Sequence, residues 1–539
     1  MPDNVSETTL TVKAAKSFKF IFAVIVFLTA FLIYAKTTNY QLTGLDDINF
    51  IHTFAYKYHP ADSFVTAFET NALFGGPTPY YRPVLSLSFV ISDKIAGQSE
   101  SFAHFVNVLL HAFCALLVFI FLRRYIFDEK ISFFAAMLFA VHPIAVYTAA
   151  WIPGRNDSLF LIGFILALAF FIEYLDKKKL RFIFLNVLFT LMCFFTKESG
   201  LIVPFIFVFY YVTHFKKYGK LDLKEYAAAV ISWVIAMLVF WFARKAAMSG
   251  AGISEVNLKP DNIRMFFDYY LSAIFMTTPF RALYGDVNVS FYILGSLAFA
   301  MTAFFAFFEK NKEQRIENFF WFALPFILIA PTLVSERLWF QGNRMYVPMF
   351  AIIILFFSFL KPYLTKKNII VHVVVAAVFI IGLVASLSGS EGFSGSLPFW
   401  NKVVSESNYD NITAKKFQAN AYISNNRTDD AVKEMLTINK SINYSDPEIF
   451  YFLGVAFYQN ENYKDAARVF ESLLAHGYMT VPQTYANLAL SYYYLKDKQK
   501  AQYYFNELVK ISHSTPQYAL AYVRGYAMHL QSQKGEALR

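Results

Sequence analysis

Side chains that could carry chemistry stand where apolar stretches of this sequence meet polar loops. Asp46 and Asp47 are adjacent and follow the first apolar stretch. Neighbouring carboxylates can supply a general base for a hydroxyl nucleophile, or ligands for a divalent cation such as Mg²⁺ or Mn²⁺. Which aspartate acts, and whether a metal takes part, stays open at this point. The pair could instead cap a helix.

Four cations occupy similar junctions between apolar and polar segments. They are Arg82, Arg155, Lys197 and Arg344. Arginine and lysine bind phosphate and stabilise the charge of a departing phosphate group, so we expect these side chains to hold a phosphate or pyrophosphate. Two of the cations also have a structural interpretation, because Arg155 could pair with Asp157 and Lys197 with Glu198.

Five further polar residues near these junctions are expected to order such a site: His104, His142, Asp157, Glu198 and Tyr346. His104, Asn107 and His111 are spaced three and four residues apart, which places them on one face of a helix. Histidines on such a face are more often packing residues than ligands. The joint placement of these residues, more than any single motif, therefore indicates a site.

The elements that must position these residues are membrane helices. Of 539 residues, 57% are hydrophobic and only 16% are charged, against about a quarter charged in ordinary soluble domains. Apolar runs near the length of a bilayer span recur over the first 390 positions. These features exclude a soluble cytosolic enzyme, a secreted disulfide scaffold and a disordered chain.

Charge placement predicts the topology. The net charge of +10 comes from basic residues in short loops between apolar segments. Basic loops of this kind lie on the cytoplasmic side of membrane proteins, so the charge does not indicate a nucleic-acid partner. The N-terminus is then cytoplasmic, and the candidate site residues lie on the outer side. Segment 263–284 is expected to be interfacial or re-entrant, because a span there would break the charge pattern. About eleven spans are expected, which places the C-terminus on the outer side: 17–35, 102–122, 131–151, 158–175, 181–196, 201–215, 226–242, 289–308, 319–334, 346–360 and 369–387. Twelve spans with a cytoplasmic C-terminus are the alternative.

The composition changes after residue 388. We expect an all-α chain with a polytopic membrane domain over 1–388, including a first outer loop at 36–101, a linker over 389–410 and a helical repeat domain over 411–539. Ala431, Ala466 and Ala501 recur at a spacing of about 35 residues, which is typical of tetratricopeptide helix pairs. Stacked pairs of this kind form an α-solenoid, which predicts a groove for an extended polypeptide partner; a purely structural role is the alternative.

Six short stretches resemble the transmembrane O-mannosyltransferases with tetratricopeptide repeats, members of the GT-C glycosyltransferase superfamily. Five match in order: Asp46-Asp47, Tyr81-Arg82-Pro83, the eight residues from His104 to His111, His142-Pro143-Ile144 with Gly154-Arg155-Asn156-Asp157, and Lys197-Glu198-Ser199-Gly200. The sixth, Arg344-Met345-Tyr346-Val347-Pro348, is similar to a later family segment with altered spacing. The resemblance covers nearly the whole chain. Leu45 departs from the family pattern, where an aromatic residue is common, and the repeat region is shorter than in animal members.

The resemblance implies an outward-facing transferase that takes its sugar from a polyprenyl-phosphate carrier, with an acidic residue of the first loop as the base. The expected function is transfer of a sugar or oligosaccharide to Ser or Thr of exported proteins. The expected location is a bacterial inner membrane, or the endoplasmic reticulum membrane in a eukaryote. Two alternatives stay open. The same fold could glycosylate a lipid or wall glycan, or the chain could be a non-enzymatic scaffold or transporter.

Overall fold

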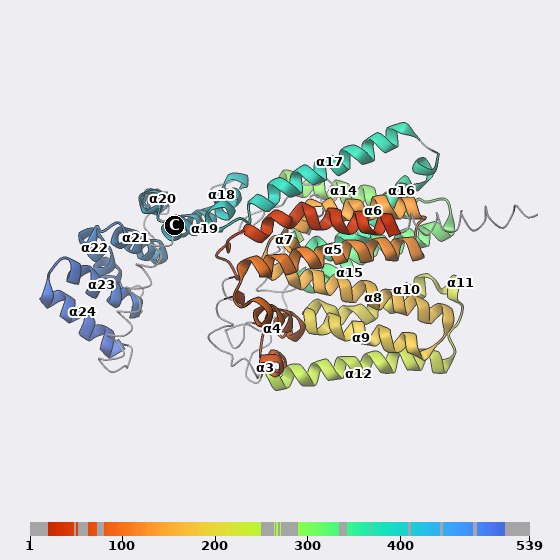
Figure 1. The fold of residues 1–539 in the computed structure, drawn as a ribbon, viewed down its shortest axis with the longest axis horizontal. Helices are drawn as coiled ribbons and strands as arrows, with labels where there is room; N and C mark the ends of the chain where they lie inside the picture. Colours follow the sequence, from red (N-terminus) through yellow and green to blue (C-terminus); the bar gives the residue numbers. More distant parts are fainter. Residues whose placement is uncertain are drawn as a thin grey trace, which may run out of the picture. The chain divides into compact units, whose positions relative to one another are not determined.

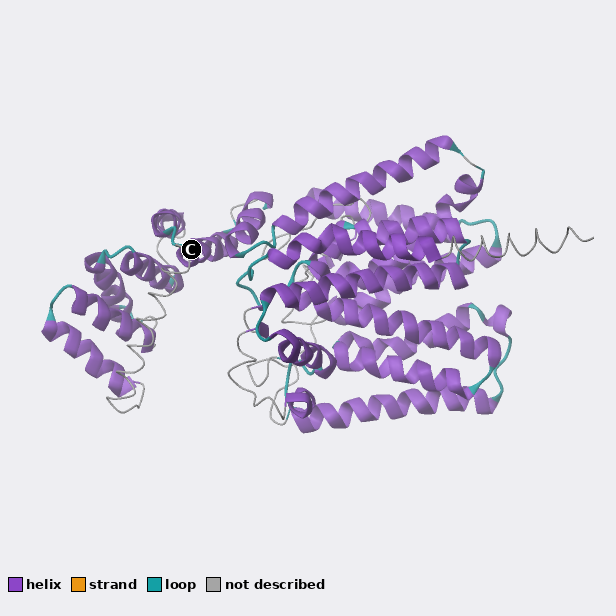
Figure 2. Ribbon diagram, in the orientation of Figure 1, coloured by secondary structure: helices purple, strands orange, loops and turns teal. Residues whose placement is uncertain are grey.

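The computed structural model describes residues 20–47, 50–51, 63–72, 80–248, 263–264, 266–267, 270, 289–333, 342–366, 368–407, 411–441, 446–477 and 482–511. These residues form helices and no strand (Figure 2). The chain divides into two compact units, Met1–Gly395 and Ser396–Arg539. The all-α class is therefore confirmed for the described part of the chain.

Long apolar helices make up the first unit (Figure 1). Among the described residues, seven are long and apolar enough to cross a membrane, or eight if a bent pair forms one span. The seven are Phe20–Asn39, Glu100–Tyr125 (α5), Ile152–Lys177 (with α8, Arg155–Lys177), Leu223–Ala247 (α12), Lys312–Leu333 (α15), Gly342–Thr365 (with α16, Tyr346–Thr365) and Ile369–Glu391 (α17). Three shorter apolar helices are Leu180–Thr196 (α9), Glu198–Thr213 (η5, Glu198–Ile202, and α10, Val203–Thr213) and Ile293–Phe307 (in α14, Val289–Phe307). The count of eleven spans and the orientation stay predictions, and most of segment 263–284 lies outside the described residues.

Packing separates buried helices from helices that face the surroundings. α8 packs against both α5 and α9, and almost all of its side chains are buried, including Phe164 and Phe171. By contrast, α17 exposes Ile369 and Val373, at 72% and 60%. Apolar side chains exposed over a whole helix face are typical of a surface covered by lipid.

The predicted span 131–151 is bent, which the sequence prediction of a continuous helix missed. Glu129–Val141 (α6) ends at His142, and Pro143–Ala149 (η3, Pro143–Ala145, and α7, Val146–Ala149) continues at an angle of 47°. His142 has extended backbone angles, and its Nδ1 accepts a hydrogen bond from the Ile144 backbone N–H at 3.2 Å. Proline lacks the N–H that would continue the helix, so the bend occurs at this position.

The segment predicted as a linker, 389–410, is largely helical. Helix α17 continues to Glu391, and Ser396–Glu406 forms α18, which packs against α19 (Ile412–Ser424). Trp400 of α18 stacks on Phe417 of α19 with 4.7 Å between ring centroids. Serine and glycine content predicted a linker, and these apolar contacts stabilise a helix within it.

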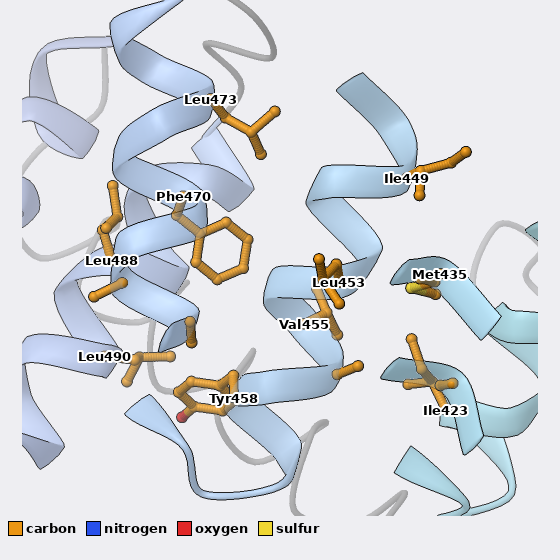
Figure 3. Packing of buried hydrophobic residues seen from close by; sticks show 14 of the residues in the cluster. Ile423, Met435, Ile449, Leu453, Val455, Tyr458, Phe470, Leu473, Leu488 and Leu490 are labelled. Atoms are coloured by element: carbon orange, nitrogen blue, oxygen red, sulfur yellow. The ribbon is translucent and has the colours of Figure 1, made fainter. Parts of the chain in front are cut away.

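Among the described residues of the second unit, six further helices follow α18, each packed on the next. They are α19, α20 (Thr428–Ser441), α21 (Pro447–Gln459), α22 (Tyr463–Ala475), α23 (Pro482–Tyr494) and α24 (Lys498–Ile511). The first helices of the three pairs begin at 412, 447 and 482, and the second helices at 428, 463 and 498, so both series advance by 35 residues. The pairs share a core that includes Leu453 and Phe470 (Figure 3). A Cβ on Gly454 would lie 2.7 Å from the Phe470 ring, which shows how closely α21 and α22 approach. The tetratricopeptide assignment itself stays a prediction.

Candidate functional site

The two adjacent aspartates of the first loop have different environments. Asp47 is 1% exposed, and its Oδ2 accepts hydrogen bonds from the Thr43 backbone N–H at 2.5 Å and the Thr43 hydroxyl at 2.8 Å. Asp46 is exposed. Partial desolvation and the negative charge of Asp47 raise the pKa of the Asp46 carboxyl, and the nearby Arg82 opposes this shift. Asp46 is therefore the aspartate that a substrate can reach.

Arg82 forms the second part of the site. It precedes Pro83–Ala96 (α4), and its Nε and Nη2 donate to Glu198 Oε2 at 3.0 and 2.6 Å. The guanidinium also lies over the Tyr80 ring, 4.2 Å from its centroid. Arginine bound by both a carboxylate and an aromatic face has a fixed orientation.

A buried lysine forms the third part. Lys197 is 6% exposed, and its Nζ donates to Asp157 Oδ1 at 2.5 Å. Asn343 donates to the other oxygen of Asp157 at 2.8 Å. Burial lowers the pKa of Lys197 to about 8, while the charge of Asp157 acts in the opposite direction. Asp157 lies in the first turn of α8, where the helix dipole stabilises a negative charge.

Arg344 completes the group, which we name the charged cluster: Asp46, Arg82, Asp157, Lys197, Glu198 and Arg344. Arg344 lies within electrostatic range of Asp157, Arg82 and Glu198. Arg82 and Lys197 each form an ion pair, whereas no residue in the described part of the chain forms one with Arg344. Its buried Nε also has no hydrogen-bond partner there. The cluster therefore contains a cation with donors available for an added anion.

Close backbone packing positions Lys197 and Glu198. Lys197 has extended backbone angles at the end of α9, and η5 turns back onto that helix. A Cβ on Gly200 would lie 2.5 Å from both the carbonyl carbon and the oxygen of Cys193, a distance that real side chains do not reach. Glycine is thus required for the turn that directs both charged side chains into the cluster.

Arg155, predicted to hold phosphate, lies outside this cluster. Its buried guanidinium donates to Asn107 Oδ1, the Ser88 and Ala103 carbonyls and Ser92 Oγ at 3.0 to 3.1 Å. These oxygens belong to α4 and α5, so Arg155 connects the start of α8 to both helices. We therefore leave Arg155 out of the group that receives a substrate.

The predicted ordering residues divide into two groups. Asp157 and Glu198 are in the charged cluster, whereas His104, His142 and Tyr346 are buried in helix packing. The Tyr346 hydroxyl lies 2.8 Å from His111 Nδ1, and His104 contacts the edge of Tyr40. Tyr80 and Asn343 contact the cluster but are not among the predicted site residues. Their positions next to the predicted Tyr81-Arg82 and Arg344 motifs were the available signal.

The described residues contain no group of three or more His, Cys, Asp or Glu side chains arranged to hold a metal ion. Asp47 is already bonded to Thr43. A divalent cation at Asp46 or Asp47 stays a prediction.

An apolar groove begins close to the charged cluster. A cavity of about 220 Å³ is lined by His142, Trp321, Ile353 and other residues of α6, α14, α15 and α16. A second cavity, of about 470 Å³, shares Leu138, Phe356 and Val378 with it and continues along α6 and α17. At the His142 end, η3 contacts Gly342–Met345 (η7), which contains Arg344. The groove is therefore next to the turn that contains Arg344.

Comparison with known proteins agrees with the motif-based expectation. Residues 78–242 match the family Dolichyl-phosphate-mannose-protein mannosyltransferase. The matched stretch contains Arg82, Asp157, Lys197 and Glu198, whereas Asp46 and Arg344 lie outside it. The chain is thus a multi-pass membrane protein that resembles the transmembrane O-mannosyltransferases of the GT-C superfamily, and the predicted resemblance is confirmed.

Individual relatives match over limited stretches. Mouse protein O-mannosyl-transferase TMTC1 is 35% identical over 98 residues, which is 18% of this chain and 10% of that protein. A protein O-mannosyl-transferase of Caenorhabditis elegans is 34% identical over 141 residues, or 25% of this chain and 19% of its own length. An uncharacterized Aquifex aeolicus protein is 22% identical over 310 residues, covering 57% of this chain and 58% of the relative. The matches thus span less than two thirds of these relatives.

Proposed function

We propose that this chain transfers a sugar, or an oligosaccharide, from a polyprenyl-phosphate or pyrophosphate carrier to Ser or Thr of an exported protein. The observation that carries the proposal is Arg344, which forms no ion pair with any described residue, in a cluster that also presents the exposed carboxylate of Asp46. The match to a protein mannosyltransferase family supports the reaction class. The outward orientation of the cluster comes from the charge pattern of the loops.

Arg344 and Asp46 have complementary roles in this reaction. Arg344 binds the carrier phosphate, and Lys197 and Arg82 add positive charge beside it. Asp46 accepts the proton of the acceptor hydroxyl as its oxygen attacks the anomeric carbon of the sugar. The bond between that carbon and the phosphate oxygen breaks, and the phosphate leaves with the electron pair. Cations placed where this negative charge develops lower the barrier.

The apolar groove suits the lipid part of such a donor. Its lining is almost entirely hydrophobic, and it begins at η3, next to η7. A phosphate bound at Arg344 would allow an attached hydrocarbon chain to lie along α6 and α16. A water-soluble sugar nucleotide has no group that would benefit from this surface.

The test compares glycopeptides of exported proteins from cells with this chain, cells without it, and cells with Arg344→Gln. We expect loss of a Ser- or Thr-linked glycan in the second and third cases, and the missing mass identifies the transferred sugar. Arg315→Gln is the matched control, because Arg315 is exposed at the start of α15 and is not part of the cluster. Unchanged protein glycans in cells without the chain would contradict the proposal.

A further inference from the structure

A basic pocket lies at the other end of the helices that form the charged cluster. η5 and α10 run from Glu198 to Thr213, and α16 runs from Tyr346 to Thr365, so Thr213 and Lys361 are distant from the cluster along both helices. A cavity of about 510 Å³ is present here between the ends of α5, α10, α15 and α16. The loop charges assign this end to the cytoplasmic side.

Four lysines line this cavity: Lys216, Lys217, Lys312 and Lys361. We call these residues and the cavity the basic pocket. Among the described residues, none of the four lysines forms an ion pair. Lys216 and Lys217 lie in α11 (Phe215–Tyr218), Lys312 begins α15 and Lys361 lies in α16, so the lysines come from three segments far apart in the sequence. Like charges that converge from separate helices repel one another, and a bound anion relieves that repulsion.

The acidic groups of the pocket neutralise only part of this charge. Glu317 is already occupied, because its Oε2 lies 2.5 Å from His214 Nε2 and its Oε1 accepts from Trp321 Nε1 at 2.6 Å. Glu313 is exposed in the first turn of α15. Asp176 also lies within electrostatic range of Lys217. Four lysines against these three carboxylates still leave an excess of positive charge. Ile126, Phe127 and Ile316 add an apolar wall.

We propose that the basic pocket binds a phosphate group, carried either by an anionic membrane phospholipid or by a small soluble phosphate. Lysines supply compact charges that bind phosphate without requiring one fixed geometry. Basic pockets between membrane helices bind anionic lipid headgroups in the same way. This binding is independent of the proposed transfer reaction, because the basic pocket shares no residue with the charged cluster.

The experiment is native mass spectrometry of the full chain purified in detergent. It is titrated separately with phosphatidylglycerol, phosphatidylcholine and glycerol 3-phosphate. The pocket variant replaces its four lysines by glutamine: Lys216→Gln, Lys217→Gln, Lys312→Gln and Lys361→Gln. The control removes the same charge from four other lysines of the same end that do not line the cavity: Lys179→Gln, Lys220→Gln, Lys224→Gln and Lys310→Gln.

We expect the wild type and the control to retain phosphatidylglycerol in preference to phosphatidylcholine. The pocket variant should bind it at least about tenfold more weakly, since several surface charges contribute to headgroup binding. If the wild type binds glycerol 3-phosphate, the pocket variant does not, and neither lipid is preferred, the ligand is a soluble phosphate. Equal loss of binding in both variants overturns the proposal. Binding of phosphatidylglycerol and glycerol 3-phosphate that is no stronger than binding of phosphatidylcholine overturns it as well.

A single substitution covers the case in which the pocket variant does not fold. Glu313→Gln removes an exposed negative charge from the rim and leaves all four lysines in place. We expect it to bind the phosphate ligand more tightly than the wild type. Unchanged or weaker binding by a monodisperse Glu313→Gln protein contradicts the proposal as well.

Discussion

At the scale of single residues, the same side chain serves different purposes depending on its partners. Asp46 and Asp47 are neighbours, yet Thr43 binds one carboxylate while the other is exposed. Arg155 and Arg344 differ in the same way, because protein oxygens accept from the donors of Arg155, whereas no described residue accepts from the buried Nε of Arg344. Residue type suggested the chemistry in each case, and the surrounding hydrogen bonds distinguish a structural group from a candidate reactive one.

The two aspartates should therefore respond differently to substitution. Asp46→Asn removes the base and is expected to lower the transfer rate by about 10² to 10⁴-fold without changing the unfolding temperature. Asp47→Asn weakens charge-assisted bonds to Thr43 and should cost about 1 to 3 kcal/mol of stability. Thermal unfolding in detergent and transfer assays on the same preparations separate the two effects. Full activity of Asp46→Asn would show that another group acts as the base.

Titration of the charged cluster should give the reaction a bell-shaped pH profile. Activity rises with pH as Asp46 loses its proton, and the raised pKa of Asp46 moves this limb above the range of an ordinary aspartate. Activity then falls as Lys197 loses its proton and its positive charge near a pKa of about 8. In Lys197→Arg the charge persists, so the falling limb of kcat/KM should move to higher pH.

The measurement is kcat/KM for the donor between about pH 5 and pH 10. Lys220→Arg is the control, because Lys220 is exposed in a loop at the other end of the unit. A falling limb at the same pH in all three proteins would remove Lys197 from the assignment.

At the scale of elements, the sequence predicted the apolar helices well and their irregularities poorly. Apolar length predicted α5, α8, α12 and α17, because lipid requires long apolar helices with internally satisfied hydrogen bonds. The bend at His142 was missed, since a proline after a histidine does not reveal by itself how the chain continues. The direction of the Arg155 side chain depends on the tertiary packing of α4 and α5, which no local pattern encodes.

Gly200 is the element-scale feature with the clearest consequence. In Gly200→Ala the new Cβ would overlap the Cys193 backbone, so η5 must move away from α9. We expect a loss of about 1 to 3 kcal/mol of stability and a fall in kcat, because Lys197 and Glu198 move with the turn. Ser199→Ala, in the same turn, should change neither quantity. Wild-type unfolding and kcat in Gly200→Ala would contradict the close packing described above.

At the scale of the whole molecule, the chain joins two units that are characterised by different observations. The first contains the charged cluster and the stretch that matches a known family. The second contains helix pairs at a 35-residue interval. Its period was readable from Ala431, Ala466 and Ala501, since small residues recur where paired helices approach. Which polypeptide it binds was not readable, because the same core packing supports many different surfaces.

Removal of residues 411–539 tests what the second unit contributes. If the repeats hold a polypeptide acceptor, the truncated chain should lose transfer to a full-length exported protein by at least about tenfold, because tethering raises the local acceptor concentration. Transfer to a short Ser- or Thr-containing peptide should persist. If the truncated chain is as active as the full chain on both acceptors, or if both chains modify a lipid, a lipid or glycan acceptor is favoured instead.

The break at Lys197 also has a consequence for the surrounding bilayer. Leu180–Thr196 ends at this break and Glu198–Thr213 begins there, and they contain 17 and 16 residues. At about 1.5 Å per residue they reach about 24 to 26 Å, less than the roughly 30 Å of a typical hydrocarbon core. Beside these two helices we expect the hydrocarbon layer to thin, because neither helix spans its full thickness. Activity should therefore depend on the length of the lipid acyl chains, and we expect activity in vesicles to decline as these acyl chains lengthen.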